Sequence, residues 1–185
     1  LSRNVTILAG QATAKIDVNV IDDSILEDAE TVIVTLASTD DADVTIDSGA
    51  NSATVTITDD DTALASISVT DSVAGEPSDA GQFTVTMTNA SDKNTVVNFA
   101  VSGDAGIGTD INAVGTSVTI LAGDTTATID VSVIDDLVLE DAESVTITLL
   151  GTDDTNVTID TSANVSTLTV TDNDTALVAD RKSVV

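Results

Sequence analysis

The sequence contains no cysteine, histidine, tryptophan or tyrosine. Without cysteine a chain forms no disulfide, and without cysteine and histidine it lacks the usual ligands of zinc and copper. Two phenylalanines are the only aromatic residues, so a folded core has to be aliphatic. Catalysis by histidine and the stacking of a sugar ring on tryptophan or tyrosine are therefore excluded, and we expect no enzymatic activity.

Positive charge is also scarce, with five lysines and arginines against 32 aspartates and glutamates, for a net charge of −27. Such a surface repels nucleic acid and anionic lipid and attracts cations. No apolar run approaches the ~18 residues of a membrane span, so we expect no nucleic-acid partner and no direct membrane insertion. Unlike disordered acidic chains, the sequence is rich in Val, Ile and Thr, which indicates a folded protein.

A long internal repeat organises the chain. Residues 5–64 recur without a gap as residues 118–177, so that VTILAGQATAKIDVNVIDD returns as VTILAGDTTATIDVSVIDD. A repeat of this size is a whole small domain rather than a solenoid turn. We predict a complete repeat over 62–174. The partial repeat over 1–61 would be the C-terminal half of another, and 175–185 the start of a next repeat or a tail, although 179–185 depart from the register.

Apolar and polar residues alternate with a period of two in the complete repeat, as in Phe83-Thr84-Val85-Thr86-Met87. This pattern is typical of antiparallel sheets with one face in water. We predict an all-β fold, a seven-stranded antiparallel immunoglobulin-like β-sandwich. The partial repeat would hold only the last four strands, which leaves a core face uncovered and predicts low stability. The expected strands A to G are 65–70, 82–88, 95–101, 116–121, 126–134, 143–150 and 165–171.

Acidic residues gather where alternating strand directions bring four loops to one end of the sandwich, the acidic pole. Like charges in one place repel unless a cation neutralises them. Ca²⁺ suits such a place because it takes six to eight oxygen ligands in flexible geometry. The alternative is a solvated acidic rim that keeps the protein soluble. The pole would hold Glu76, Asp110, Asp135, Asp136, Glu140, Asp141, Glu143, Asp172 and Asp174.

The motifs IDDLVLEDAESVTITL and TVTDND resemble the Calx-β domain, which occurs in the cytoplasmic calcium sensors of sodium–calcium exchangers and in large bacterial surface proteins. The resemblance implies an immunoglobulin-like sandwich that binds Ca²⁺ at its distal loops. In the complete repeat the implied ligands are Glu76, Asp110, Asp135, Asp136, Glu140, Glu143, Asp172, Asp174 and the carbonyl of Val138. In the partial repeat they are Asp22, Asp23, Glu27, Glu30, Asp59, Asp60, Asp61 and Ile25.

Two departures from the family pattern bear on these sites. The closing aspartate triplet Asp59–Asp61 becomes Asp172-Asn173-Asp174 in the complete repeat, where the amide oxygen of asparagine can still serve as a ligand. The partial repeat has no counterpart of Glu76 or Asp110, so we expect its site to be incomplete.

The linker between the repeats is very short, so the acidic pole of one repeat should abut the next. We therefore expect a calcium-binding structural or adhesive module, a Ca²⁺-stiffened spacer in a large protein that is extracellular or lies on a bacterial cell surface. Its partners would be calcium ions and neighbouring repeats, while other domains would contact a cell-surface or glycan target. The alternative is a Ca²⁺-sensing regulatory domain of a membrane transporter such as a sodium–calcium exchanger.

Overall fold

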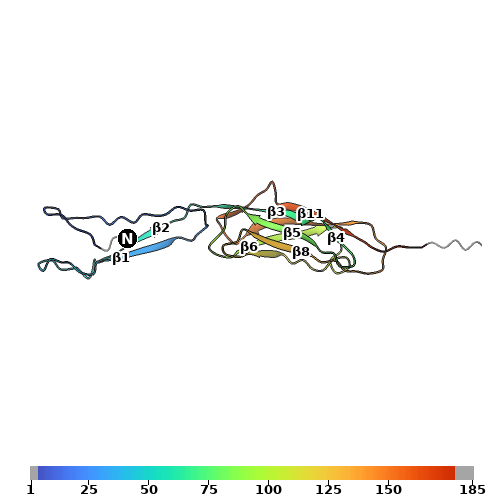
Figure 1. The fold of residues 1–185 in the computed structure, drawn as a ribbon, viewed down its shortest axis with the longest axis horizontal. Helices are drawn as coiled ribbons and strands as arrows, with labels where there is room; N and C mark the ends of the chain where they lie inside the picture. The colour runs from blue at the N-terminus through green and yellow to red at the C-terminus, as the bar shows by residue number, and fades with distance from the viewer. Residues whose placement is uncertain (1–3, 178–185) are drawn as a thin grey trace, which may run out of the picture.

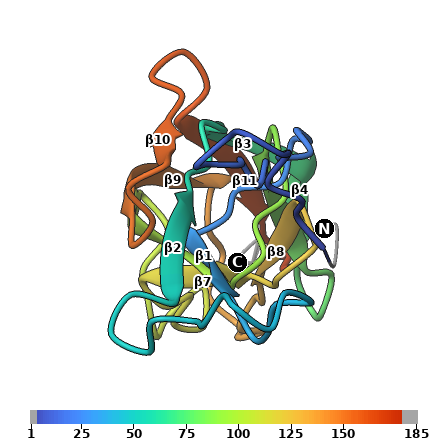
Figure 2. The same ribbon diagram turned by 90° about the vertical axis from the view of Figure 1, so that its left-hand side faces the viewer.

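The computed structural model describes residues 4–177, which form two units placed end to end along one long axis (Figure 1). The complete repeat is a two-sheet sandwich, and the partial repeat is a two-stranded sheet with long irregular loops. In an end-on view β1 and β2 lie in front of the sandwich (Figure 2). The regular elements of residues 4–177 are all strands, so no helix in that range could span a membrane. The all-β prediction is confirmed.

The complete repeat has the predicted sandwich architecture. One sheet has the strand order β10-β3-β5-β8 and the other β4-β11-β9-β6-β7. All seven strands expected from the sequence form, and wherever two of these seven are paired, the pair is antiparallel. They are β3 (Ala63–Asp71), β5 (Gly81–Met87), β6 (Thr95–Gly103), β7 (Ser117–Ile120), β8 (Thr126–Val131), β9 (Glu143–Thr152) and β11 (Val165–Thr171).

Two further strands, β4 (Val73–Gly75) and β10 (Val157–Ile159), were not predicted. Each has three residues, too few to produce a readable alternation, and each pairs in parallel, β4 with β11 and β10 with β3. After β3 the chain crosses to the other sheet as β4. The backbone N–H of Glu76 then donates to the carbonyl of Thr171, 3.1 Å away. This crossing brings Glu76 beside the end of β11.

The core is aliphatic except for two aromatic rings, as the composition required. Phe83 and Phe99 are both buried, one from each sheet. Ile147 and Leu168 on the second sheet belong to the same core cluster. In β5 every second residue is buried, in keeping with the alternation read from the sequence.

The partial repeat forms only β1 (Glu30–Thr35) and β2 (Ser52–Ile57), which pair with each other. Our prediction of four strands was wrong for residues 4–7 and 13–18, the counterparts of β7 and β8, which are not strands. In the complete repeat β7 pairs with β6 and β8 pairs with β5. The partial repeat has no counterpart of β5 or β6, so these two segments have no neighbouring strand with which to form a sheet. Residues 178–185, including the irregular tail, lie outside the described residues.

Candidate metal centre

Carboxylates from four segments meet at the end of the sandwich that faces away from the partial repeat. Glu76 follows β4, and Asp110 lies between β6 and β7. Glu140 lies between β8 and β9, while Asp172 and Asp174 follow β11. The convergence of chain-distant acids at one pole therefore exists in the structure.

Three of these carboxylates are close enough to share one ion. One carboxylate oxygen from each of Glu76, Asp172 and Asp174 lies within 4.8 Å of the other two. Asp172 is held by backbone donors: the N–H of Glu140 lies 2.9 Å from Oδ2 and that of Asp174 lies 2.7 Å from Oδ1. Within residues 4–177, Glu76 Oε2 and Asp174 Oδ2 are buried with no hydrogen-bond partner. A buried carboxylate oxygen without a donor is unfavourable unless a ligand satisfies it.

The pKa values of these three carboxylates shift in different directions, because only Asp172 accepts two backbone N–H groups. The two backbone N–H groups lower the pKa of Asp172 below its ordinary value of 3.8. Partial burial raises the pKa of Glu76, and the carboxylate of Asp172 raises it further. Partial burial also raises the pKa of Asp174, followed by the charges of Asp172 and Asp135. A bound cation would oppose both upward shifts.

A second group of acids adjoins the first. Asp110 is 9% exposed, its Oδ2 accepts from the N–H of Gly106, and its carbonyl accepts from Ile134 at 2.8 Å. Burial raises the pKa of Glu143, and a hydrogen bond with Asp110 raises it further. Burial and then the charge of Asp110 raise the pKa of Glu140. The Glu140 N–H on Asp172 joins the two groups into one centre.

The remaining predicted positions lie at the margin of this centre. Asp136 Oδ1 accepts from the backbone N–H of Val138 at 2.6 Å. Asp135 is exposed and accepts from the side-chain amide of Asn173 at 3.3 Å. The charges of both aspartates help to raise the pKa of Asp174. The role of these residues as ligands stays a prediction.

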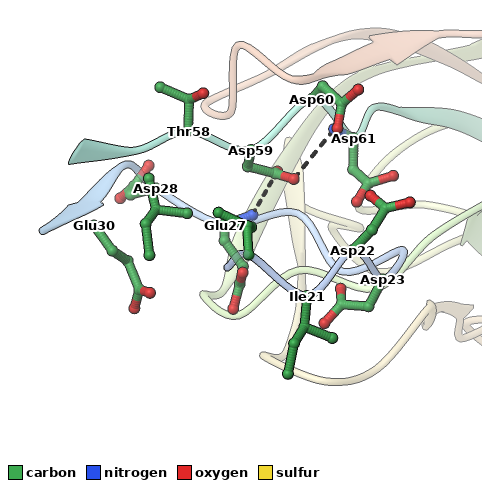
Figure 3. A pocket seen from close by; sticks show the side chains of 12 residues that line it. Ile21, Asp22, Asp23, Glu27, Asp28, Glu30, Thr58, Asp59, Asp60 and Asp61 are labelled. Atoms are coloured by element: carbon green, nitrogen blue, oxygen red, sulfur yellow. Dashed lines mark hydrogen bonds between the residues drawn. The ribbon is translucent and has the colours of Figure 1, made fainter. Parts of the chain in front are cut away.

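The partial repeat reproduces this geometry at a spacing of 113 residues (Figure 3). The N–H of Glu27 donates to Asp59 Oδ2 at 2.9 Å and that of Asp61 to Asp59 Oδ1 at 3.2 Å. The N–H of Ile25 donates to Asp23 Oδ1 at 2.8 Å. Backbone donors lower the pKa of Asp59, while partial burial raises the pKa of Glu27 and Asp61. The local hydrogen bonds of the acidic motif are therefore present even in a repeat that has only two of its strands.

Asp23, Glu27, Asp59 and Asp61 line one pocket of the partial repeat. The other acids predicted for this site line it too, together with one acid that was not predicted. Asp22, Glu30 and Asp60 are among its lining residues, and so is Asp28, which the sequence analysis did not single out. Asp28 pairs across the junction with Lys93 of the complete repeat. The acidic motif of one repeat does not by itself predict which of its residues contact the next repeat.

Comparison with known protein families gives one match, found twice along the chain. The sequence model of the Calx-beta domain matches residues 2–61 and 59–174. No match was found among curated proteins.

Among solved structures, the chain is similar to the apo form of the Calx CBD1 domain, with 16% identity and a TM-score of 0.48 over 60% of this chain and 99% of that one. It is also similar to CBD12 from CALX1.2, with 20% identity and a TM-score of 0.49 over 58% and 44% of the two chains. The calcium binding domain CBD12 of CALX1.1 gives 19% identity and a TM-score of 0.48 over the same shares. The two family matches span nearly the whole sequence, and the chain belongs to the Calx-beta domain family.

Proposed function

We propose that the chain is a calcium-binding structural module in which Ca²⁺ neutralises the acidic pole. The observation that carries this proposal is the pair of buried, unpartnered oxygens, Glu76 Oε2 and Asp174 Oδ2, beside Asp172. Ca²⁺ binds oxygens at about 2.3–2.6 Å, so two ligands of one ion are at most about 5 Å apart. The mutual separation of up to 4.8 Å in this group fits that limit.

The chemistry of the donor set favours Ca²⁺ over other divalent cations. Mg²⁺ usually keeps several waters and takes one or two carboxylates, whereas this pole offers carboxylates from four segments. A purely solvated rim would leave its carboxylates in water. Here Asp110 is buried, and partial burial raises the pKa of Glu76, Glu140 and Glu143. A cation would relieve the cost of keeping these groups charged.

We place this module in a tandem array, as a Ca²⁺-stiffened spacer of a large extracellular or bacterial cell-surface protein. The acidic loop, residues 21–29 of the partial repeat and 134–142 of the complete repeat, recurs once per repeat, and in the partial repeat it lies at the junction. This recurrence supports a role in stiffening. The lack of cysteine and the scarcity of lysine suit that setting. Adhesive contacts with a surface or glycan would belong to other domains. We propose no catalytic role, since the clustered acids are accounted for by cation binding.

Calorimetric titration with Ca²⁺ tests the proposal and its setting. An extracellular spacer should bind with a dissociation constant of about 10⁻⁴–10⁻³ M, whereas a cytosolic sensor would bind at about 10⁻⁷–10⁻⁵ M. Asp172→Asn should weaken binding at the complete repeat by at least about tenfold, because Asp172 lies at the centre of the acid group. Asp124→Asn, an exposed acid in the turn between β7 and β8, is the matched control and should change little. An absence of saturable binding at Ca²⁺ concentrations well above the dissociation constant expected for a spacer would contradict the proposal.

A further inference from the structure

The junction between the two repeats is built around one leucine. Leu26 lies in the acidic loop of the partial repeat, yet it is only 1% exposed. Its N–H donates to the carbonyl of Ala90 at 2.9 Å, and its carbonyl accepts from the N–H of Asp92 at 3.0 Å. The hydroxyl of Ser91, also 1% exposed, donates to the same carbonyl at 3.3 Å. The acidic loop thus docks on the turn between β5 and β6.

A charge pair lies beside this contact. Lys93 is the only basic residue between positions 62 and 174, and its ammonium lies 2.8 Å from Asp28 Oδ1. The same ammonium lies 3.8 Å from Asp154 Oδ2, whose side chain is 3% exposed. An exposed ion pair of this kind adds less than about 1 kcal/mol, but it orients the partners. The end of the complete repeat that carries Lys93 is called its base. This base therefore presents one cation to the acidic pole of the repeat before it.

The acidic loop of the complete repeat carries the same two docking residues, and within residues 4–177 neither has the partners found at the first junction. Leu139 is the counterpart of Leu26 and Asp141 that of Asp28, both 113 positions further on. The backbone around them is held alike, by Glu140 N–H on Asp172 as by the corresponding donor in the partial repeat. Yet Leu139 is 60% exposed where its counterpart is 1% exposed.

We propose that Leu139 and Asp141 form the docking surface for a following repeat of the same type. Leu139 seats against the counterpart of Ser91 in that repeat, and Asp141 pairs with the counterpart of Lys93. The contacts of the existing junction support this docking, and none of them involves a calcium ion. Because the acidic loop of one repeat binds the base of the next, the contact propagates in one direction and builds a linear array.

The test extends the chain by a second copy of residues 62–174 placed directly after Asp174, with only the added copy isotope-labelled. The readout is amide hydrogen exchange at the counterpart of Asp92 in the added copy, the group that would donate to the carbonyl of Leu139. We expect this amide to be protected and Leu139→Asp to speed its exchange by at least tenfold. Leu137→Asp is the matched control, since Leu137 is 91% exposed and its counterpart is Ser24. It should leave the exchange unchanged.

A charge swap keeps the test independent of any local loss of structure. Asp141→Lys should weaken the second junction, and changing the lysine of the added copy to aspartate in the same chain should restore the protection. Equal exchange in the parent and Leu139→Asp chains would overturn the proposal. So would self-association of the unextended chain that Leu139→Asp abolishes, because the surface would then bind a separate molecule.

Discussion

At the scale of single residues, neighbouring carboxylates of the acidic pole have pKa values that are shifted in opposite directions. Asp172 accepts two backbone N–H groups, which favour its charged form. Glu76 and Asp174 lie beside it, partly buried and each with one oxygen that has no donor. The sequence could predict that these acids share a pole, because strand direction alternates. It could not predict which oxygens receive backbone donors, since that depends on the exact path of the loops.

The raised pKa values predict that without calcium the protein loses stability as pH rises. A carboxyl whose folded pKa is raised holds its proton more tightly when folded. Its contribution is therefore full below the ordinary value of 4.5 and is lost as pH rises through the raised pKa. Glu76, Glu140 and Glu143 behave in this way. Asp172 acts in the opposite sense, but only below its ordinary value of 3.8. In chelator the unfolding temperature should be higher at pH 5 than at pH 7.

Thermal unfolding followed by circular dichroism measures this difference. Glu140→Gln should reduce it, because the variant removes one of the charges that burial disfavours. Asp124→Asn, at the opposite pole, should leave it unchanged. An unfolding temperature that rises from pH 5 to pH 7 in chelator would refute this explanation.

Gly103 ends β6 in a conformation that other residues rarely adopt, with φ at 132°. A Cβ there would lie 2.1 Å from the carbonyl oxygen of Ser144. We expect Gly103→Ala to destabilise the complete repeat by about 1–3 kcal/mol in urea unfolding. Gly151→Ala in β9 is the control, since a Cβ there meets nothing within 4 Å. Equal stability of the two variants would show that the strand is not constrained at Gly103.

At the scale of elements, the alternation predicted every long strand of the complete repeat. It missed β4 and β10 because three residues carry too little pattern, and because their parallel pairing depends on how the chain crosses between sheets. The same local sequence is a strand in one repeat and irregular in the other: VTI is part of β7 at 118–120 but forms no strand at 5–7. Local pattern sets strand propensity, while a partner strand decides whether the strand forms.

Hydrogen exchange should reveal this difference within one molecule. Amides of residues 13–18 should exchange much faster than those of β8, although the two segments are counterparts in sequence. Placing a copy of residues 62–113 directly before Leu1 keeps the repeat register and supplies the missing partner strands. Protection should then appear over 13–18. Its continued absence would mean that the partial repeat lacks strand-forming capacity of its own.

At the scale of the whole molecule, the two repeats form an extended pair (Figure 1), and Leu26 is buried where they meet. We predict that this buried leucine keeps the two repeats aligned. Because the chain lacks cysteine, Ser52→Cys and Ser117→Cys give one spin label in each repeat. We expect a narrow distance distribution in the parent chain. Leu26→Asp should broaden it, since a charge in that buried seat is unfavourable.

Leu139→Asp is the matched control for this experiment, because in the unextended chain that position is exposed. It should leave the distribution narrow. Equal widths in the parent and Leu26→Asp chains would show that the short linker alone aligns the repeats.

The central claim is that calcium completes the acidic pole, and differential scanning calorimetry of the whole chain tests it most directly. Calcium that binds only the folded state adds about 2.7 kcal/mol per site at a hundredfold excess over the dissociation constant. We predict a clear rise in the unfolding temperature when Ca²⁺ exceeds the dissociation constant about a hundredfold, reversed by chelator and reduced in Asp172→Asn. The same unfolding temperature in calcium and in chelator would contradict the account.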